Sequence, residues 1–419
     1  MKIHKIEWFD EFECIGGACP QTCCKGWLIP LDKEDLIRYR EERGRLAISL
    51  FTATAGYTRN KINLSSGECR FHTKEGLCRL QLKKGHDFIP WACRSFPRFY
   101  RNYGEFEERY LDLSCIAAAG IFVRNMGNIR IIEDAAEPET RPCTTNDDTA
   151  YLDTLLSIRK DIIDAISSDK IRNMTGDTTA GTVYYAEIME RIYSYACRLQ
   201  DLYAAEGEAT VIPSLCEYEA LRNETLKNGA VSASPVKAGD ASSGVSSIFP
   251  FPLNVISRLT ETILYYFGQK KTGPALYGLL SDARDVISDY RRTDTDLIGR
   301  MNGILNSGPL LSGLPGAYLS YYLYQYFLDA YETYSFRRIT ALGIIHVNMI
   351  LFLILVLTEK RKIPVNTGRN TPEDGSSDGL NKPDISPDDI ASVTALYNRK
   401  AFFNETIQNN LYEIFEEMT

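Results

Sequence analysis

The sequence predicts a mainly α-helical protein, in which a small irregular α+β module rich in cysteine precedes an all-α helical body. Two observations indicate this division. Eight of the 11 cysteines fall within the first 115 residues, and from Thr149 onward apolar residues recur at the spacing of helices. A composition of 44% hydrophobic and 24% charged residues is typical of globular proteins, and it excludes disorder as the dominant state.

The clustered cysteines indicate metal binding rather than disulfide bonding. A chain of 419 residues buries a sufficient core without cross-links, so the cysteines need another reason. The segment 1–7 contains no apolar run of signal-peptide length, and we therefore expect a cytoplasmic protein. In that reducing compartment a dense cysteine cluster binds metal more often than it forms disulfides. The eight cysteines are Cys14, Cys19, Cys23, Cys24, Cys69, Cys78, Cys93 and Cys115.

The charge balance argues against a nucleic-acid partner. The net charge is -8, and residues 1–115 carry 19 Lys and Arg against 16 Asp and Glu. Neither part of the chain therefore has the charge of a polyanion-binding surface.

Residues 341–358 (ALGIIHVNMILFLILVLT) are almost entirely apolar and approach the length of a membrane span. They include His346 and Asn348, and no second span exists. We therefore expect a buried core helix and no stable membrane insertion.

Two segments rich in small and polar residues divide the chain. Residues 228–247 are expected to be a flexible linker or loop, and residues 364–385 a flexible loop. The other predicted parts are a cysteine-rich metal-binding module at 1–125, a helical segment at 126–227, a helical body with a Tyr-rich helix at 248–363, and C-terminal helices at 386–419.

Near the N-terminus, local signals predict a strand followed by a capped helix. Residues 27–31 (WLIPL) favour a short strand. Asp32 is expected to be the N-cap of a helix that runs to about Glu42, with Asp35 in the capping-box position.

Residues 69–81 (CRFHTKEGLCRLQ) predict a hairpin. Two short runs flank the turn 73–76, where Gly76 supplies a positive φ. Such a hairpin brings Cys69 and Cys78 together.

Beyond Thr149 the chain is expected to be nearly all α. Helices are predicted at about 152–166, 185–202, 253–267, 275–290, 317–334 and 337–357. The last helical stretch begins with Ser386 as its cap and Pro387 at the first helical position, and its apolar stripe is interrupted near Asn398.

The opening array Cys14-x4-Cys19-x3-Cys23-Cys24 allows thiolates to converge, because short turns let their side chains point inward. With the four later cysteines it can form one four-cysteine site with spares, or two sites. Thiolate ligands select zinc or an iron–sulfur cluster over magnesium or calcium. His72 and His86 are candidate minor ligands, although ordinary loop positions explain both.

The residues around these cysteines resemble the flagellin lysine-N-methylase family, which belongs with the cysteine-rich zinc- or iron-chelating domain proteins. The similarity covers residues 12–118, and it is weaker at 317–332 and 397–415. The matching segments are 19–27 (CPQTCCKGW), 69–71 (CRF), 77–81 (LCRLQ), 93–98 (CRSFPR) and 113–115 (LSC).

This resemblance implies methyl transfer from S-adenosylmethionine to lysine side chains. The implied partner is a protein substrate with surface lysines, such as flagellin. The implied metal centre is an iron–sulfur cluster, with zinc as the alternative. Two other readings stay open: a metal-binding or redox-sensing module without catalysis, and a zinc-stabilised scaffold for protein interaction.

Methyl transfer to lysine requires a neutral amine in line with the sulfonium. Aromatic faces attract such cations, so Tyr318, Tyr321 and Tyr322 are catalytic candidates, with core packing as the alternative. Arg94 and Arg98 are candidates for stabilising an anionic thiolate–metal centre or for binding the carboxylate of the methyl donor, and a solvated basic turn is the alternative.

Two familiar methyltransferase signatures are absent from the sequence. No Gly-rich strand–loop–helix fingerprint is visible. The radical spacing Cys-x3-Cys-x2-Cys would require a cysteine where Gly26 stands. A cluster in this protein is therefore expected to have a structural or substrate-positioning role.

Overall fold

In a computed structural model of the chain, the structure describes residues 1–26, 28–127, 129–140, 149–166, 180–204, 249–268, 274–362, 385–399 and 404–419. The described residues beyond Thr149 are almost all helical, which confirms the mainly α prediction. The predicted linker 228–247 and nearly all of the predicted loop 364–385 lie outside the described residues. The predicted domain boundaries stay a prediction.

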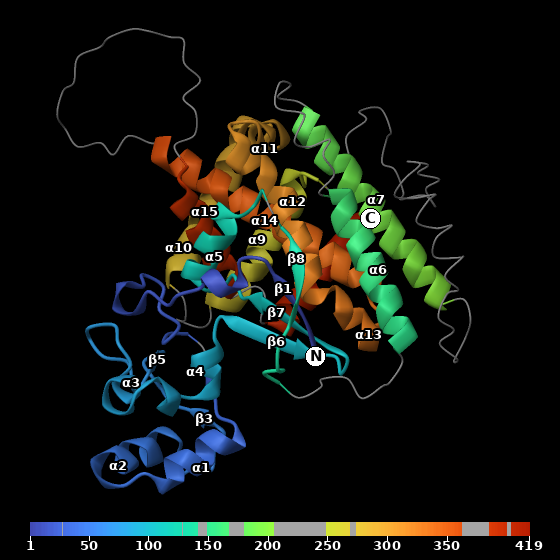
Figure 1. Cartoon of the computed structure of the whole chain (residues 1–419). Coiled ribbons are helices and arrows are strands. Elements are labelled where there is room, and N and C mark those ends of the chain that lie inside the picture. Colours follow the sequence, from blue (N-terminus) through green and yellow to red (C-terminus); the bar gives the residue numbers. More distant parts are fainter. Residues whose placement is uncertain are drawn as a thin grey trace, which may run out of the picture.

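The helices of the larger body are α5 (Ile116–Arg124), α6 (Thr149–Ile166), α7 (Ala180–Ala204), α9 (Leu253–Gly268), α10 (Pro274–Thr293), α11 (Leu297–Leu305), α12 (Pro309–Tyr326), α14 (Phe336–Lys362), α15 (Pro387–Tyr397) and α16 (Glu405–Met418) (Figure 1). The short α11 was not predicted from the sequence. The predicted cap of α15 is confirmed, since Ser386 and Asp389 form a reciprocal capping box.

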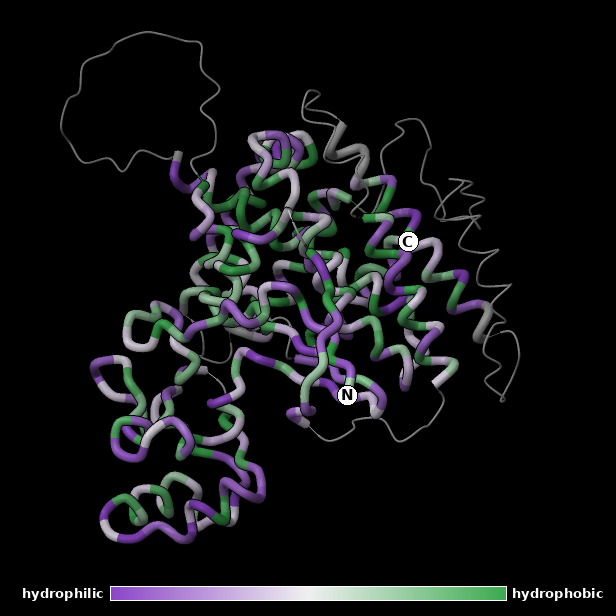
Figure 2. Tube along the Cα trace, in the orientation of Figure 1, coloured by the Kyte–Doolittle hydropathy of each residue, from purple (hydrophilic) through white to green (hydrophobic). Residues whose placement is uncertain are grey.

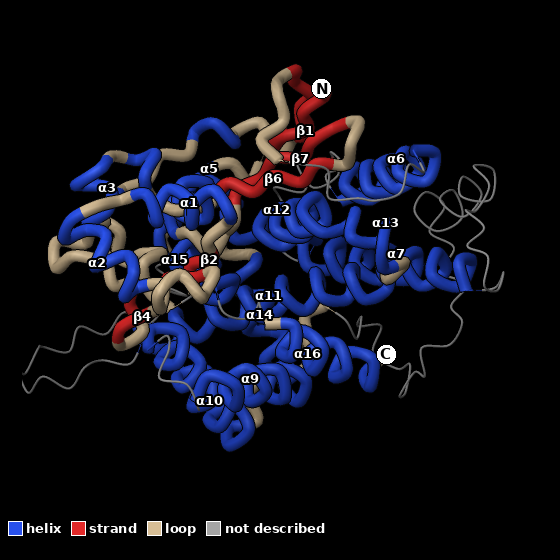
Figure 3. Tube along the Cα trace, turned by 90° about the horizontal axis from the view of Figure 1, so that it is seen from below, coloured by secondary structure: helices blue, strands red, loops and turns tan. Residues whose placement is uncertain are grey.

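A four-stranded sheet lies on one side of this body, next to α6 and α12 (Figure 3). Its order is β6 (Arg98–Asn102), β7 (Phe106–Leu111), β1 (Lys2–Ile6) and β8 (Ile131–Ala135). Strand β1 is parallel to β7 and antiparallel to β8. The expectation of an all-α body is therefore wrong at one point, because β8 falls in the segment predicted to be helical.

Tyrosine hydroxyls join the sheet to α12. The Tyr321 hydroxyl donates to the carbonyl of Leu111 at 2.7 Å and accepts from the Leu111 amide at 2.9 Å. The Tyr324 hydroxyl lies 2.9 Å from the carbonyl of His4 on β1. Buried aromatic rings with satisfied hydroxyls thus connect neighbouring strands to one helix.

The predicted helix 317–334 is interrupted in the structure. Helix α12 ends at Tyr326 and is followed by a 3₁₀ turn, η5 (Phe327–Asp329), and one short turn, α13 (Ala330–Thr333). Tyr334 then adopts a left-handed conformation with φ of 52°. The apolar pattern continues through the interruption, so periodicity alone does not reveal it.

Helix α14 is the buried centre of the body. Its segment Phe336–Arg361 is long and apolar enough to cross a membrane, but the 18-residue window with that hydropathy is entirely buried inside the protein. This confirms the predicted core helix. Figure 2 shows hydrophobic residues running through the helical body that surrounds it.

A second, smaller hydrophobic core defines the cysteine-rich module (Figure 1, lower left). Its elements are β2 (Ile29–Pro30), α1 (Lys33–Glu41), α2 (Gly44–Ala53), β3 (Lys61–Ile62), β4 (Leu64–Ser65), β5 (Glu68–Cys69), α3 (Arg79–Lys84), η3 (His86–Phe88) and α4 (Trp91–Ser95). Strand β2 pairs with β3, and Asp32 caps α1 in a capping box with Asp35, as predicted. Trp27 lies outside the described residues.

The predicted hairpin at 69–81 is confirmed in its turn and not in its second strand. The Gly76 amide donates to the Thr73 carbonyl, and Gly76 has φ of +78°. A single antiparallel bridge joins His72 and Cys78, after which the chain enters α3. The second strand is therefore one residue long.

The buried ion pair between Glu108 on β7 and Arg159 on α6 provides a stability test. Arg159 Nη1 lies 3.0 Å from Glu108 Oε2 and 3.0 Å from the Tyr324 carbonyl, and both charged side chains are buried. Arg159→Met leaves a buried carboxylate unpaired, so we expect a loss of about 3–5 kcal/mol in the free energy of unfolding. Chemical denaturation measures it. Lys160→Met is the control, because it removes only an exposed ion pair with Asp164 and should change the free energy of unfolding by less than about 0.5 kcal/mol. Equal losses in the two variants would contradict the importance of burial for the Glu108–Arg159 pair.

His346 on α14 predicts a pH dependence. Burial lowers the pKa of His346 to about 3, while its ring nitrogen Nδ1 lies 2.9 Å from the Tyr397 hydroxyl. In the unfolded chain this histidine binds a proton as the pH drops below about 6.5, whereas in the folded chain it stays neutral. The free energy of unfolding therefore falls as the pH drops below 6.5. Relative to His346→Asn, the native protein should lose up to about 1.4 kcal/mol per pH unit below 6.5. Denaturation curves from pH 7.5 to 5 measure the free energy of unfolding of both proteins. A difference between the two that stays constant with pH would refute the proposed role of His346.

Candidate metal centre

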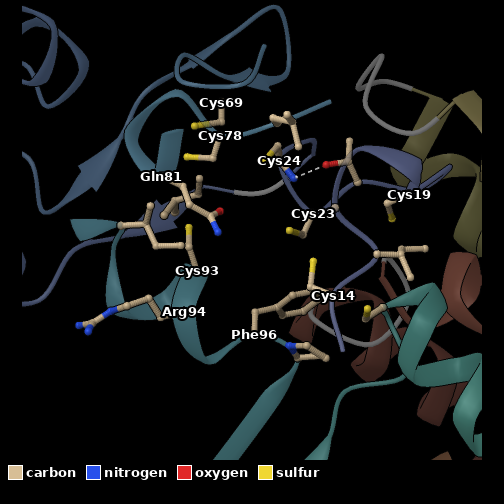
Figure 4. A pocket seen from close by; sticks show the side chains of 18 of the residues that line it. Cys14, Cys19, Cys23, Cys24, Cys69, Cys78, Gln81, Cys93, Arg94 and Phe96 are labelled. Carbon is tan, nitrogen blue, oxygen red and sulfur yellow. Dashed lines mark hydrogen bonds between the residues drawn. The ribbon is translucent and has the colours of Figure 1, made fainter. Parts of the chain in front are cut away.

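All eight predicted cysteines line one cavity of about 380 Å³ where the module meets the body (Figure 4). None of the eight forms a disulfide. Residues separated by as many as 101 positions in the sequence, from Cys14 to Cys115, thus face a common space. The cavity also has apolar walls, which include Phe12, Phe71 and Phe96.

The cysteines reach this cavity from five places in the chain. Cys14, Cys19, Cys23 and Cys24 lie in the irregular segment between η1 (Phe9–Glu11) and β2, around the single 3₁₀ turn η2 (Gly16–Ala18). Cys69 ends β5, and its amide donates to the Cys24 carbonyl at 2.8 Å. The remaining three lie at helix starts or in a short helix: Cys78 is the N-cap of α3, Cys115 is the N-cap of α5, and Cys93 lies in α4.

A close backbone approach fixes the first cysteine loop against the module. A Cβ atom placed on Gly17 would lie 2.8 Å from the Glu75 carbonyl, and one on Gly76 would lie 3.1 Å from Gly17. The two glycines therefore permit a contact that larger residues would obstruct. This contact holds the loop that carries Cys14 and Cys19 beside the turn that precedes Cys78.

Burial disfavours the thiolate form of most of these cysteines. It raises the pKa of Cys69 and of Cys115 to about 11, and that of Cys93 well above the ordinary value. Cys24 differs from these, because hydrogen bonds, the first from the Cys23 thiol, lower its pKa to about 6. A bound cation would replace the protons of the others.

Positive side chains dominate the charged groups of the cavity wall. Arg94, Arg98 and Arg399 line it, and Glu13 is the acidic residue among the lining residues. Arg98 Nη2 donates to the Phe12 carbonyl at 2.7 Å, and Arg94 lies over the Trp91 ring at 5.5 Å. Both sequence-predicted arginines are therefore at the cavity, where their charge suits thiolates or the carboxylate of a ligand.

Arg399 is a lining residue that was not predicted from the sequence. It follows α15, far from the cysteines in sequence, and it donates to the carbonyls of Gln21, Thr22 and Ser114. No local pattern distinguishes it from other arginines in the chain. Only the packing of α15 against α5, which starts at Cys115, brings it to this place.

The three candidate tyrosines lie elsewhere. Tyr318, Tyr321 and Tyr322 are buried in the larger core and do not line the cavity. The Tyr318 hydroxyl donates to Asn398 Oδ1 at 2.8 Å, and the Tyr322 ring lies tilted beside His346, with ring centroids 5.6 Å apart. The packing alternative therefore describes their surroundings, and a catalytic role for them stays a prediction.

Of the two histidines considered as minor ligands, His86 lines the cavity and His72 does not. His72 Nδ1 lies 3.2 Å from Glu68 Oε2. This carboxylate pairs with Nδ1, whereas Nε2 of His72 is buried without a hydrogen-bond partner among the described residues.

The donor set fits a soft metal centre by its chemistry. Free thiols surround the cavity, and cationic residues stand where an anionic thiolate centre would need them. Within the described residues, no group of three His, Cys, Asp or Glu side chains is already spaced to hold one ion. Binding would therefore require the thiols to move closer together.

Comparison with known proteins finds relatives among flagellar and methylase proteins. The chain is 30% identical over 113 residues to the flagellar biosynthetic protein FliU of Salmonella muenchen, a match that covers 25% of this chain and 67% of that protein. It is also 30% identical over 113 residues to the lysine-N-methylases of Salmonella typhimurium strain LT2 and Salmonella choleraesuis strain SC-B67. The match spans 28% of the length of each of these two methylases.

No protein-family model matches the chain, and no solved structure matches it. The relationship to FliU nevertheless covers two thirds of that relative, and it agrees with the cysteine pattern read from the sequence. The chain belongs to the family of FliU and the flagellin lysine-N-methylases.

Proposed function

We propose that this protein transfers a methyl group from S-adenosylmethionine to lysine side chains of a protein substrate, and that the substrate is a flagellin-type surface protein. The similarity to proteins named lysine-N-methylase and FliU carries this proposal. Cytoplasmic location is part of it, because free thiols in this number persist in a reducing compartment.

The cavity supplies features that such a reaction needs. An incoming lysine must lose a proton before attack, and an apolar environment disfavours its charged form. Phe12, Phe71 and Phe96 provide apolar and aromatic surface in the cavity wall. Arg94 lines the cavity from α4, its guanidinium lies over the Trp91 ring, and its Nε is buried without a hydrogen-bond partner among the described residues. We assign this unpaired donor to the carboxylate of the methyl donor.

The thiols of the same cavity are the proposed ligands of an iron–sulfur centre, with zinc as the alternative. Soft sulfur donors, the absence of disulfides among them and the nearby arginines support this assignment. Such a centre would fix the irregular loops that form the cavity wall. The residues of this chain would thereby hold the substrate-binding surface in place.

A non-catalytic metal-binding or redox-sensing module is the second candidate. It is favoured by one observation: thiols gather at the cavity, whereas the candidate catalytic tyrosines lie in the core. The two functions predict different results in a methylation assay.

The methylation prediction uses purified protein, purified flagellin and S-adenosylmethionine with a labelled methyl group. We expect label on flagellin lysines, identified by mass spectrometry of peptides. Arg94→Met should raise the KM for S-adenosylmethionine by about tenfold or more, since a charge-assisted hydrogen bond contributes about 1.5–3 kcal/mol. Arg338→Met is the control, because that arginine bonds Asn409 on the exposed surface. Absence of label with metal-replete protein would favour the non-catalytic module.

The metal prediction uses anaerobic purification, elemental analysis, acid-labile sulfide and an absorption spectrum. We expect iron with sulfide, and a loss of at least about half of both in Cys93→Ala, because Cys93 is partly buried at the cavity wall. Cys197→Ala is the matched control, since Cys197 is a free cysteine on α7 that does not line the cavity. Zinc without sulfide would select the alternative metal. Full metal content in Cys93→Ala would refute the proposed ligand set.

A further inference from the structure

The eight thiols of the cavity belong to two different parts of the molecule. Four of them are in or against the small core of the module: Cys69 is a member, and Cys24, Cys78 and Cys93 pack on it. Cys115 instead packs against the large core of the body. We call Cys24, Cys69, Cys78 and Cys93 the inner set, and Cys14, Cys19, Cys23 and Cys115 the bridging set.

Resting on the metal centre proposed above, we propose that the two sets are separate four-thiol metal sites, and that the bridging site clamps the module to the body with Arg399 as its positioning residue. The cavity geometry allows this division. In Figure 4 the thiols of Cys69, Cys78 and Cys93 lie on one side, and those of Cys14, Cys19 and Cys23 lie toward the other.

The electrostatic neighbours of the thiols support the same division. After burial, the groups that raise the pKa of Cys93 are Cys69, Cys24 and Cys78, followed by Asp35 of the module. For Cys115 the corresponding neighbours are Cys19 and Cys14. Cys19 has both Cys14 and Cys24 as neighbours, and Cys23 has Cys24, Cys93 and Cys14. The boundary between the two sets therefore runs through Cys19, Cys23 and Cys24, and the bridging set is defined by the contacts of Cys115 and of the loop with the body.

The bridging set takes its ligands from both sides of the junction. Cys115 starts α5 of the body, whereas Cys14, Cys19 and Cys23 lie in the loop that leads from the body into the module. A single metal site with these four ligands would cross-link the loop to the body. The inner set, by contrast, can bind metal entirely within the module.

Arg399 already holds the two ligand-bearing segments of the bridging set. Its guanidinium donates to the carbonyl of Thr22, next to Cys23, at 3.3 Å and to the carbonyl of Ser114, next to Cys115, at 3.2 Å. Gln21 adds a side-chain hydrogen bond of 2.9 Å to Ser392 on α15. Because these bonds go to backbone carbonyls, they set where the loop lies, and the charge of Arg399 also faces Cys19.

The first test measures metal per chain in the anaerobically reconstituted full-length protein. Native protein should hold two centres. Cys115→Ala and Cys69→Ala should each lose about half of the metal, and the double variant should lose nearly all of it. Loss of all metal from either single variant, or one centre in the native protein, would overturn the two-site proposal.

The second test reports on the clamp without using activity. Hydrogen–deuterium exchange should rise in residues 14–23 and at the start of α5 in Cys115→Ala, while the helices α1 and α2 of the module remain protected. Cys69→Ala should give the opposite pattern. Increased exchange throughout the chain in Cys115→Ala would show general misfolding, and unchanged exchange in residues 14–23 would show that no clamp exists.

Arg399 is tested by the rate at which a chelator removes metal. Arg399→Met should accelerate the release of about half of the metal and leave the other half unchanged, and Arg399→Lys should restore part of the retention. Arg361→Met is the matched control, because Arg361 pairs with Asp389 at the opposite end of α15. Equal release of all metal in Arg399→Met would refute its role in the bridging site.

Methylation assays on the same samples distinguish this inference from the proposed function. If the native protein methylates flagellin but releases its metal as a single centre, the two-site clamp is refuted and the proposed function stands. If the protein holds two separable centres but does not methylate flagellin, the proposed function is refuted and the clamp stands.

Discussion

The gathering of eight thiols, most of them at least partly buried, around one cavity is the constraint on which the remaining structure depends. A buried thiol is tolerated while it is protonated, but a buried thiolate requires positive charge nearby. The cavity wall provides that charge through Arg94 of the module, Arg98 of the strand that follows it, and Arg399, which follows α15 of the body. The surrounding fold therefore has to bring several distant segments to one place and to hold them there.

The body meets this requirement through its buried centre. Helix α14 is apolar along most of its length, so the neighbouring helices must enclose it. Their arrangement fixes α12, whose tyrosines bind the backbone of the sheet, and α15, which ends just before Arg399. The position of the sheet in turn fixes where the chain leaves for the module and where it returns. The aromatic residues of α12 therefore support the cavity from a distance rather than lining it.

Much of the fold could be predicted from the sequence because the signals are local. The caps at Asp32 and Ser386 involve residues three positions apart, and the long helices repeat an apolar pattern over several turns. Strand β8 was missed because four of its five residues are exposed, so it lacks the alternating pattern of a half-buried strand. The break after Tyr326 was missed because the apolar pattern continues through it.

The candidate site was predicted to a similar extent. The eight cysteines were identified by their density, and the cavity brings them together. Arg399 could not be predicted from the sequence, because its role depends on contacts with residues 285 or more positions away. Tyr322 and Tyr326 are four residues apart on α12 and their rings are in contact, as helical spacing requires. Sequence periodicity, however, cannot distinguish a face that lines a cavity from one that enters a core.

The placement of the module within the sheet has a consequence for the order of events during protein synthesis. The module lies between β1 and β6 in the sequence, and the Arg98–Phe12 hydrogen bond shows that its entry and exit lie side by side. Strand β1 leaves the ribosome first, but its partners β7 and β8 follow only after the entire module. The module has its own core and four of the thiols, so it can fold before the strands that pair with β1 have been synthesised. The cysteines of the module would therefore bind their metal in the nascent chain before the sheet is complete.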